Sequence, residues 1–299
     1  MNLVGDETEG LKQSLSLARN STASLNILAL YPTLPTKLQA QKNAYETYLQ
    51  EHTKMSLAKA HEVVPTDLSG VTTTIRSTEI PLGIELTREV IRNEYDLLIK
   101  EAEPKESEGF KALDMTLLRK SPSAVWLARP ISRSRKEIRV CVAINPLDEG
   151  KNARELAIRL LQTARAIADD CSGTLEIISF WEYAFESYMS HNRWASIEDE
   201  EMVETLQGAQ TEHLLELNRL IKASAIEGKT KLHHLRGEAS KLLGKFTKEE
   251  KIDIMVMGTL SRSGIAGFFI GNTAENVFEE LTCSLLALKP HGYVSPVTL

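Results

Sequence analysis

The sequence has few cysteines, no excess of positive charge and no long apolar run. Its three cysteines, Cys141, Cys171 and Cys283, lack Cys-x-x-Cys spacing and cannot all pair, which predicts reduced thiols in a cytoplasmic protein. A formal charge of −6 argues against a general nucleic-acid-binding protein. No apolar run approaches the roughly 18–20 residues of a membrane span. The first twenty residues lack the basic stretch and apolar core of an export signal, so none is expected.

Motifs of several enzyme classes are also missing. The chain has no Gly-x-Ser-x-Gly elbow of a hydrolase, no Gly-x-Gly-x-x-Gly of a nicotinamide enzyme and no Gly-x4-Gly-Lys-[Ser/Thr] of a phosphate-loop NTPase. His233 and His234 are adjacent in an expected strand, so their side chains should point to opposite faces and cannot chelate one metal. We therefore expect a protein without catalytic residues and without a metal site.

What the sequence does contain is the composition of an ordinary globular protein. Of its 299 residues, 42% are hydrophobic and 25% are charged. This length suits two domains of about 150 residues each.

In the second half, short apolar strands alternate with segments of helical periodicity. Such alternation predicts βαβ units around a parallel sheet with helices on both faces. Strands are expected at 139–144, 174–181, 230–235, 252–257 and 284–288, and helices at 151–170, about 200–225, 238–246 and 272–281.

The first half repeats this pattern less clearly. Strands are expected at 25–31, 71–77, 95–99 and 124–128, with a helix ending near residue 18 and a long polar helix at 37–61. The segments LLRKSPSAVWLARP and FEELTCSLLALKP correspond, and residues 95–99 align with 252–256. We interpret the chain as two copies of one domain, residues 1–130 and 137–299, joined by a polar, basic linker at 131–136.

The two copies differ at their start. Aligning them places Asn2 opposite Asn145, so the first strand of the first copy would lie before Met1. Because that strand is usually central in a doubly wound sheet, its absence would split the sheet in two. Two explanations stay open: the chain given is shortened at its start, or the first copy simply has no such strand.

The segment 257–275, MGTLSRSGIAGFFIGNTAE, connects an expected strand to an expected helix. It resembles the Gly-x2-Gly-x9-Gly-[Ser/Thr] signature loop of the universal stress proteins, and the two-copy layout resembles their tandem subfamily, universal stress protein E. The resemblance implies an α/β fold of two open, Rossmann-like parallel-sheet domains. It also implies an intramolecular pseudo-dimer that pairs strands 124–128 and 284–288, and a cytoplasmic stress-response protein, with a homodimer left open.

The resemblance further implies a candidate ATP site in the second copy. Gly258 and Gly271 match the first and third glycines, whereas Ser261 replaces the second glycine and Asn272 replaces the Ser/Thr, with Thr273 just after it. Glycines suit phosphate binding because a Cβ often obstructs the approach of phosphate to main-chain N–H groups. The expected helix start adds free N–H groups.

Two features leave nucleotide binding undecided. Asn145 stands where an aspartate commonly contacts the base or ribose in this family. Asn272 or Thr273 could equally serve as a helix N-cap without any ligand. A bound adenine nucleotide and a vestigial loop that only shapes the domain therefore both stay open.

The first copy gives a sharper expectation. After its fourth strand come Glu101, Glu103, Glu106 and Glu108, with the single Gly109. Four carboxylates would repel phosphates, and no glycine frame allows their close approach. We expect no ATP in the first copy.

Two alternatives to a non-catalytic nucleotide binder remain. One is a weak nucleotide hydrolase that uses the loop at 258–273, although no convincing pair of metal-binding carboxylate and base is present. The other is a binder of a non-nucleotide, apolar ligand near the aromatic stretch 180–194, which could equally pack onto the following helix. No nucleic-acid or membrane partner is expected.

Overall fold

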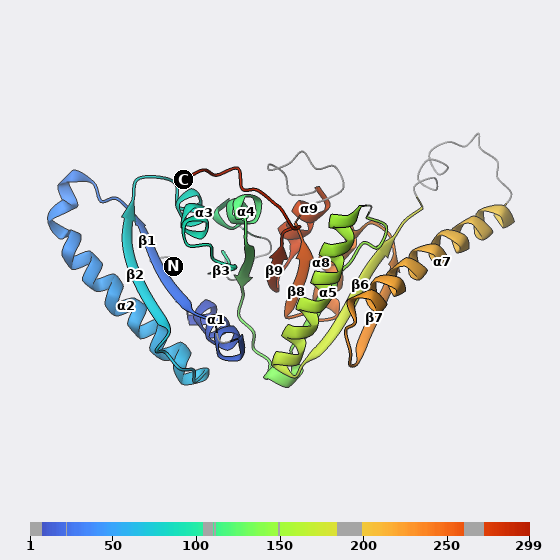
Figure 1. Cartoon of the computed structure of the whole chain (residues 1–299), viewed down its shortest axis with the longest axis horizontal. Coiled ribbons are helices and arrows are strands. Elements are labelled where there is room, and N and C mark those ends of the chain that lie inside the picture. The colour runs from blue at the N-terminus through green and yellow to red at the C-terminus, as the bar shows by residue number, and fades with distance from the viewer. Residues whose placement is uncertain are drawn as a thin grey trace.

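The computed structural model describes residues 8–21, 23–103, 110, 112–148, 150–183, 199–259 and 272–299. In the second half, strands and helices alternate in the predicted order (Figure 1). Each element begins and ends within three residues of the predicted position. The elements are β5 (Arg139–Ala143), α5 (Lys151–Cys171), β6 (Thr174–Trp181), α7 (Asp199–Ser224), β7 (Thr230–Arg236), α8 (Ala239–Glu249), β8 (Ile254–Gly258), α9 (Asn272–Glu280) and β9 (Ser284–Leu288).

The first half contains the four predicted strands and two helices that the sequence analysis did not name, α3 and α4. The predicted helix at 37–61 begins as a 3-10 turn, η1 (Thr36–Gln41), before it becomes α2. The other elements are α1 (Thr8–Ser21), β1 (Leu25–Pro32), α2 (Lys42–Val63), β2 (Val71–Thr78), α3 (Leu82–Arg92), β3 (Leu97–Glu101), α4 (Ala112–Lys120) and β4 (Ala124–Ala128), and the 3-10 turn η2 (Arg135–Glu137) follows β4.

The strands form a seven-stranded sheet of order β3-β4-β9-β8-β5-β6-β7 and a separate pair, β1-β2. All neighbours in both sheets are parallel except β4 and β9, which are antiparallel. Across this antiparallel seam Val125 lies opposite Ala287, and Leu127 lies opposite Leu285. The predicted pairing of the two last strands is therefore confirmed, and each strand covers the open edge of the other.

The first copy is divided as the sequence analysis expected. Strands β3 and β4 extend the sheet of the second copy, whereas β1 and β2 pair only with each other, beside α2 (Figure 1). Helix α1 connects the two parts: Trp126 Nε1 on β4 donates to Gln13 Oε1 at 2.7 Å, and Gln13 Nε2 donates to the Arg129 carbonyl at 2.8 Å. The same helix buries Leu15 against the β1-β2 unit.

Alternate side chains of the large sheet supply two apolar layers. On β5, Cys141 faces the cluster that contains residues of α4, α8 and α9, whereas Val140 and Val142 face the cluster of α5 and α7. Along α5 the apolar residues recur at helical spacing and are buried, namely Leu156, Ala157, Leu160, Leu161, Ala164 and Ile167. Both sheet faces are thus covered, as near-continuous apolar strands require.

The predicted linker at 131–136 is held by an ion pair and a hydrogen bond from its arginines. Arg133 Nη1 lies 3.2 Å from Asp253 Oδ2, and Arg135 donates to Ser16 Oγ at 2.8 Å. That this segment separates two domains stays a prediction. Across the described residues, no helix is both long and apolar enough to cross a membrane.

Candidate functional site

The large sheet has its topological switch point at β5. This strand pairs with β6 on one side and β8 on the other. Helix α5, which follows β5, packs on one face, and α9, which follows β8, packs on the opposite face. The chain therefore diverges at the carboxyl ends of β5 and β8, which is where ligands bind in open α/β sheets.

Asn145 follows β5 at this edge, and its side chain organises the turn there. Its Oδ1 accepts from the Leu147 N–H at 3.2 Å, and its Nδ2 donates to Asp148 Oδ1 at 2.8 Å. The turn ends at Gly150, whose φ of 95° is unfavourable for residues with a side chain, and α5 starts at the next residue. The first N–H groups of α5 consequently face the switch-point crevice.

A cavity of about 610 Å³ opens beside this turn. Its volume lies in the usual range of small-molecule sites. It carries charges of both signs, because Lys151 and Arg154 of α5 face Glu212 and Glu216 of α7. These two cations were not predicted from the sequence, although their place in the first turn of the helix that follows β5 could have suggested them.

Gly258 ends β8 next to the crevice, and its lack of a side chain matters for packing. A Cβ at this position would lie 3.1 Å from Leu156 Cδ2 of α5. The next residue, Thr259, is buried, and its N–H donates to the Leu288 carbonyl of β9 at 3.2 Å. The first glycine of the predicted loop therefore has a structural reason to be glycine whether or not a ligand binds.

The remaining predicted residues are placed only in part. Ser261 and Gly271 lie outside the described residues. Asn272 and Thr273 form the start of α9, so this N-terminus belongs to the same edge of the sheet as Asn145 and Gly258, and their side chains lie outside the description. Whether these residues contact a ligand stays a prediction.

The first copy presents carboxylates at the corresponding edge. In the alignment of the two copies Glu101 ends β3 where Gly258 ends β8, and the Ala102 N–H donates to the Ala128 carbonyl as Thr259 does to Leu288. The buried Glu101 carboxylate lies 3.5 Å from the Gly10 nitrogen in the first turn of α1. This carboxylate occupies the place at a helix N-terminus that an anionic ligand would take.

A second carboxylate at this edge, that of Asp114, also has its partners within the chain. Asp114 of α4 is fully buried, lies 3.0 Å from Lys100 Nζ and accepts from the Glu103 N–H at 2.9 Å. Burial raises the pKa of Asp114, and Lys100 and the N–H group of Glu103 oppose that shift. Glu106 and Glu108 lie outside the described residues.

The two adjacent histidines of β7 point to opposite faces, as predicted. His233 Nε2 lies 2.6 Å from Glu176 Oε2, whereas His234 Nε2 lies 2.9 Å from His213 Nδ1 of α7. Of the aromatic stretch at 180–194, Trp181 is buried and stacks on His234. Residues 184–194 lie outside the described part of the chain, so a role for them in a ligand cleft stays a prediction.

A model of the universal stress protein family matches residues 139–289, which is more than half of the chain and includes the whole switch-point crevice. The chain belongs to the universal stress protein family. Universal stress protein E of Photorhabdus laumondii is 29% identical over 220 residues, covering 71% of this chain and 67% of the relative. Universal stress protein E of Escherichia coli K12 is 28% identical over 219 residues, covering 72% and 67%.

Solved structures extend the likeness to both halves of this universal stress protein. A protein of unknown function from Pseudomonas aeruginosa PAO1 superposes with a TM-score of 0.67 at 21% identity, over 94% of this chain and 87% of its own. A universal stress protein of Archaeoglobus fulgidus superposes with a TM-score of 0.59 at 15% identity, over 94% and 92%. At these identities the likeness concerns the fold, and the predicted tandem universal stress fold is confirmed.

Proposed function

We propose that this universal stress protein is a non-catalytic, cytoplasmic stress-response protein that binds one adenine nucleotide, ATP, in its second copy and none in its first. The observation that carries the proposal is the exchange of Gly258 for Glu101 between equivalent strand ends. In the second copy no side chain projects from this position, whereas in the first a carboxylate projects and lies at the first turn of α1.

The helix N-termini and two cations at the second-copy crevice support an anionic ligand, although Glu212 and Glu216 line the same cavity. The N-termini of α5 and α9 both belong to this edge, and Lys151 and Arg154 lie in the first turn of α5. The Asn145 amide can still meet a base or ribose, although its present bonds to Leu147 and Asp148 would have to be exchanged. The nucleotide phosphates would then lie toward Gly258 and the loop that ends at Gly271.

The proposal is tested by titrating ATP into the full-length protein and by native mass spectrometry of freshly purified protein. We expect one ATP per chain. Gly258→Glu, which copies the first-copy residue, should abolish binding, whereas Gly258→Ala should keep it within about tenfold because only a methyl group is added beside Leu156. Two ATP molecules per chain, or unchanged binding by Gly258→Glu, would contradict this assignment.

A second pair of variants tests the loop itself. Gly271→Val should weaken ATP binding at least tenfold, since a branched side chain blocks the approach of phosphate to the backbone, and Ser261→Gly should leave binding equal or tighter. Gly208→Ala is the control, because this glycine lies on α7 with no neighbour within 4 Å of an added Cβ. Release of phosphate would instead favour a weak hydrolase, and a different bound mass would favour a non-nucleotide ligand.

A further inference from the structure

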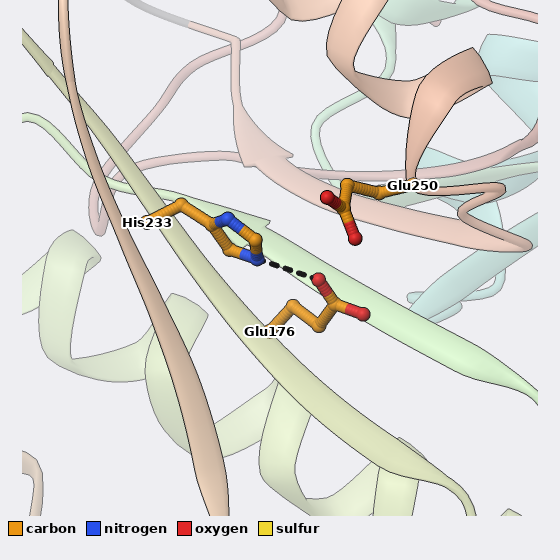
Figure 2. Close-up of side chains that lie close together, drawn as sticks. All are labelled: Glu176, His233 and Glu250. Atoms are coloured by element: carbon orange, nitrogen blue, oxygen red, sulfur yellow. Dashed lines mark hydrogen bonds and ion pairs between the residues drawn. The ribbon is translucent and has the colours of Figure 1, made fainter.

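Three side chains with metal-ligating atoms meet near the amino edge of the large sheet, on the face covered by α8. Glu176 lies near the start of β6, His233 lies on β7, and Glu250 directly follows α8. Their ligand atoms all lie within 4.8 Å of one another, and Figure 2 shows the imidazole and the two carboxylates directed toward one another. We propose that Glu176, His233 and Glu250 bind a first-row transition-metal dication, with Zn²⁺ as the best fit.

The buried member of the set is Glu176, whose side chain is only 5% exposed. An ionised carboxylate in such a place requires a nearby cation or several donors, since the desolvation penalty is several kcal/mol per ion. Its close partner is His233 Nε2, at 2.6 Å, and the ammonium of Lys231 lies farther away, at 3.8 Å. A dication bound by Glu176 and His233 would place its charge directly against this buried carboxylate.

The imidazole of His233 is held in place by an aromatic contact. Its ring packs edge-on against Phe246 of α8, with ring centroids 4.7 Å apart and planes at 77°. This contact keeps Nε2 directed toward Glu176. Tetrahedral zinc with bonds of about 2.0–2.2 Å separates its ligand atoms by roughly 3.3 Å, so the 2.6 Å pair of His233 and Glu176 would open by about 0.7 Å to admit the ion. A small rotation of the Glu250 side chain, which is 32% exposed, would bring its carboxylate oxygen to the same separation from the other two ligand atoms.

Lys231 is the competitor of the metal. Its Nζ lies 2.7 Å from Glu250 Oε2, but its side chain is 57% exposed and can turn into water at little cost. The second cation near Glu250 is Arg139, whose Nη1 is 3.9 Å away. Lys231 and Arg139 together offset the two carboxylates when no metal is bound, and a bound dication would take the place of Lys231. Removing Lys231 should therefore tighten metal binding.

The three ligand side chains favour one type of metal, and their place in the fold distinguishes this ion from any ion bound to a nucleotide. One imidazole with two carboxylates suits Zn²⁺, whereas Mg²⁺ prefers oxygen ligands alone. The cluster lies near the amino ends of β6 and β7, while the switch-point crevice lies at the carboxyl ends of β5 and β8. This metal site is thus independent of the proposed nucleotide site, and each can fail without the other.

The experiment uses the full chain after treatment with a chelator. Zn²⁺ is titrated by calorimetry, and Co²⁺ is added as a spectroscopic substitute whose visible bands report an imidazole–carboxylate site. We expect one tight Zn²⁺ per chain and a raised melting temperature, since a ligand that binds only the folded state stabilises it. Glu250→Gln and His233→Gln should each weaken Zn²⁺ binding more than about tenfold, and Lys231→Met should strengthen it.

The matched control is His234→Gln, which alters the neighbouring histidine on the opposite face of β7. It should leave the Zn²⁺ affinity and the Co²⁺ spectrum unchanged. Circular dichroism checks that the variants of the partly exposed Glu250 and Lys231 remain folded. The proposal is overturned if no Zn²⁺ binds at about 100 μM, if Glu250→Gln binds like the parent, or if His234→Gln loses binding as His233→Gln does.

Discussion

At the scale of single residues, His213 shows how a buried polar group attaches the long helix α7 to the sheet. Its side chain is 3% exposed, and its Nδ1 shares one hydrogen with His234 Nε2 of β7 at 2.9 Å. Burial, with a smaller contribution from His234, lowers the pKa of His213 to about 4. Burial also lowers the pKa of His234. The folded protein therefore holds this pair in its neutral form.

These pKa values predict how stability depends on pH. In the unfolded chain both histidines take up protons near pH 6.5, whereas His213 in the folded chain does so only near pH 4. The unfolded state thus binds more protons between these values, so stability should fall as the pH drops from about 6.5 to 4. His213→Gln should reduce this slope, measured by urea unfolding at pH 7 and 5.5. His52→Gln serves as the control; an equal slope in the His213 variant would refute the assignment.

At the scale of elements, the C-terminal tail completes helix α4. The last carbonyls of a helix have no partner within it. Three side chains of the tail supply donors in turn: Lys289 Nζ to the Leu118 carbonyl, Tyr293 Oη to Arg119 at 2.5 Å, and Ser295 Oγ to Lys120 at 2.7 Å. The tail then continues to α3 (Figure 1), where Arg88 Nε donates to the Thr298 carbonyl. One segment of the second copy thus holds two helices of the first.

Removing one of these donors should have a measurable cost. Tyr293→Phe deletes the hydroxyl that reaches the Arg119 carbonyl and should lower the free energy of unfolding by about 1 kcal/mol, the usual net value of one hydrogen bond. Chemical denaturation measures the change. Tyr48→Phe is the control, because that side chain is half exposed on α2. A loss of the same size in both variants would mean that the tail does not stabilise α4 in this way.

Sequence patterns predicted the elements of the second half because most of its strands are apolar, the edge strand β7 being the exception, and because helices such as α5 carry a regular buried stripe. Helix α3 was not predicted, although Leu82, Leu86 and Val90 show helical spacing. The polar residues Glu85 and Thr87, which this helix also buries, interrupt the apolar pattern in the sequence. At the site, the loop motif identified Gly258. Its packing against Leu156 could not be predicted, since that contact depends on how α5 crosses β8.

At the scale of the whole molecule, the two sheets should differ in stability. The β1-β2 pair has a small apolar cluster of its own, whereas the seven-stranded sheet carries an extensive apolar layer on each face. An isolated pair of strands is marginal in water and depends on what packs against it. Here α1 fills that role, with Leu11 and Leu15 against Ile27 and Ala60. The pair should therefore open before the large sheet does.

This difference is tested by hydrogen exchange of two matched variants. Leu15 and Leu161 are both fully buried leucines, the first in the β1-β2 cluster and the second in the layer of α5. Each change to alanine should cost about 2–5 kcal/mol where it acts. Leu15→Ala should speed exchange in β1, β2 and α2 and leave β5, β6 and β8 protected, whereas Leu161→Ala should speed exchange throughout the large sheet. If Leu15→Ala deprotects β5 and β8 equally, the molecule opens as one cooperative unit, and the seam between β4 and β9 transmits stability across the whole chain.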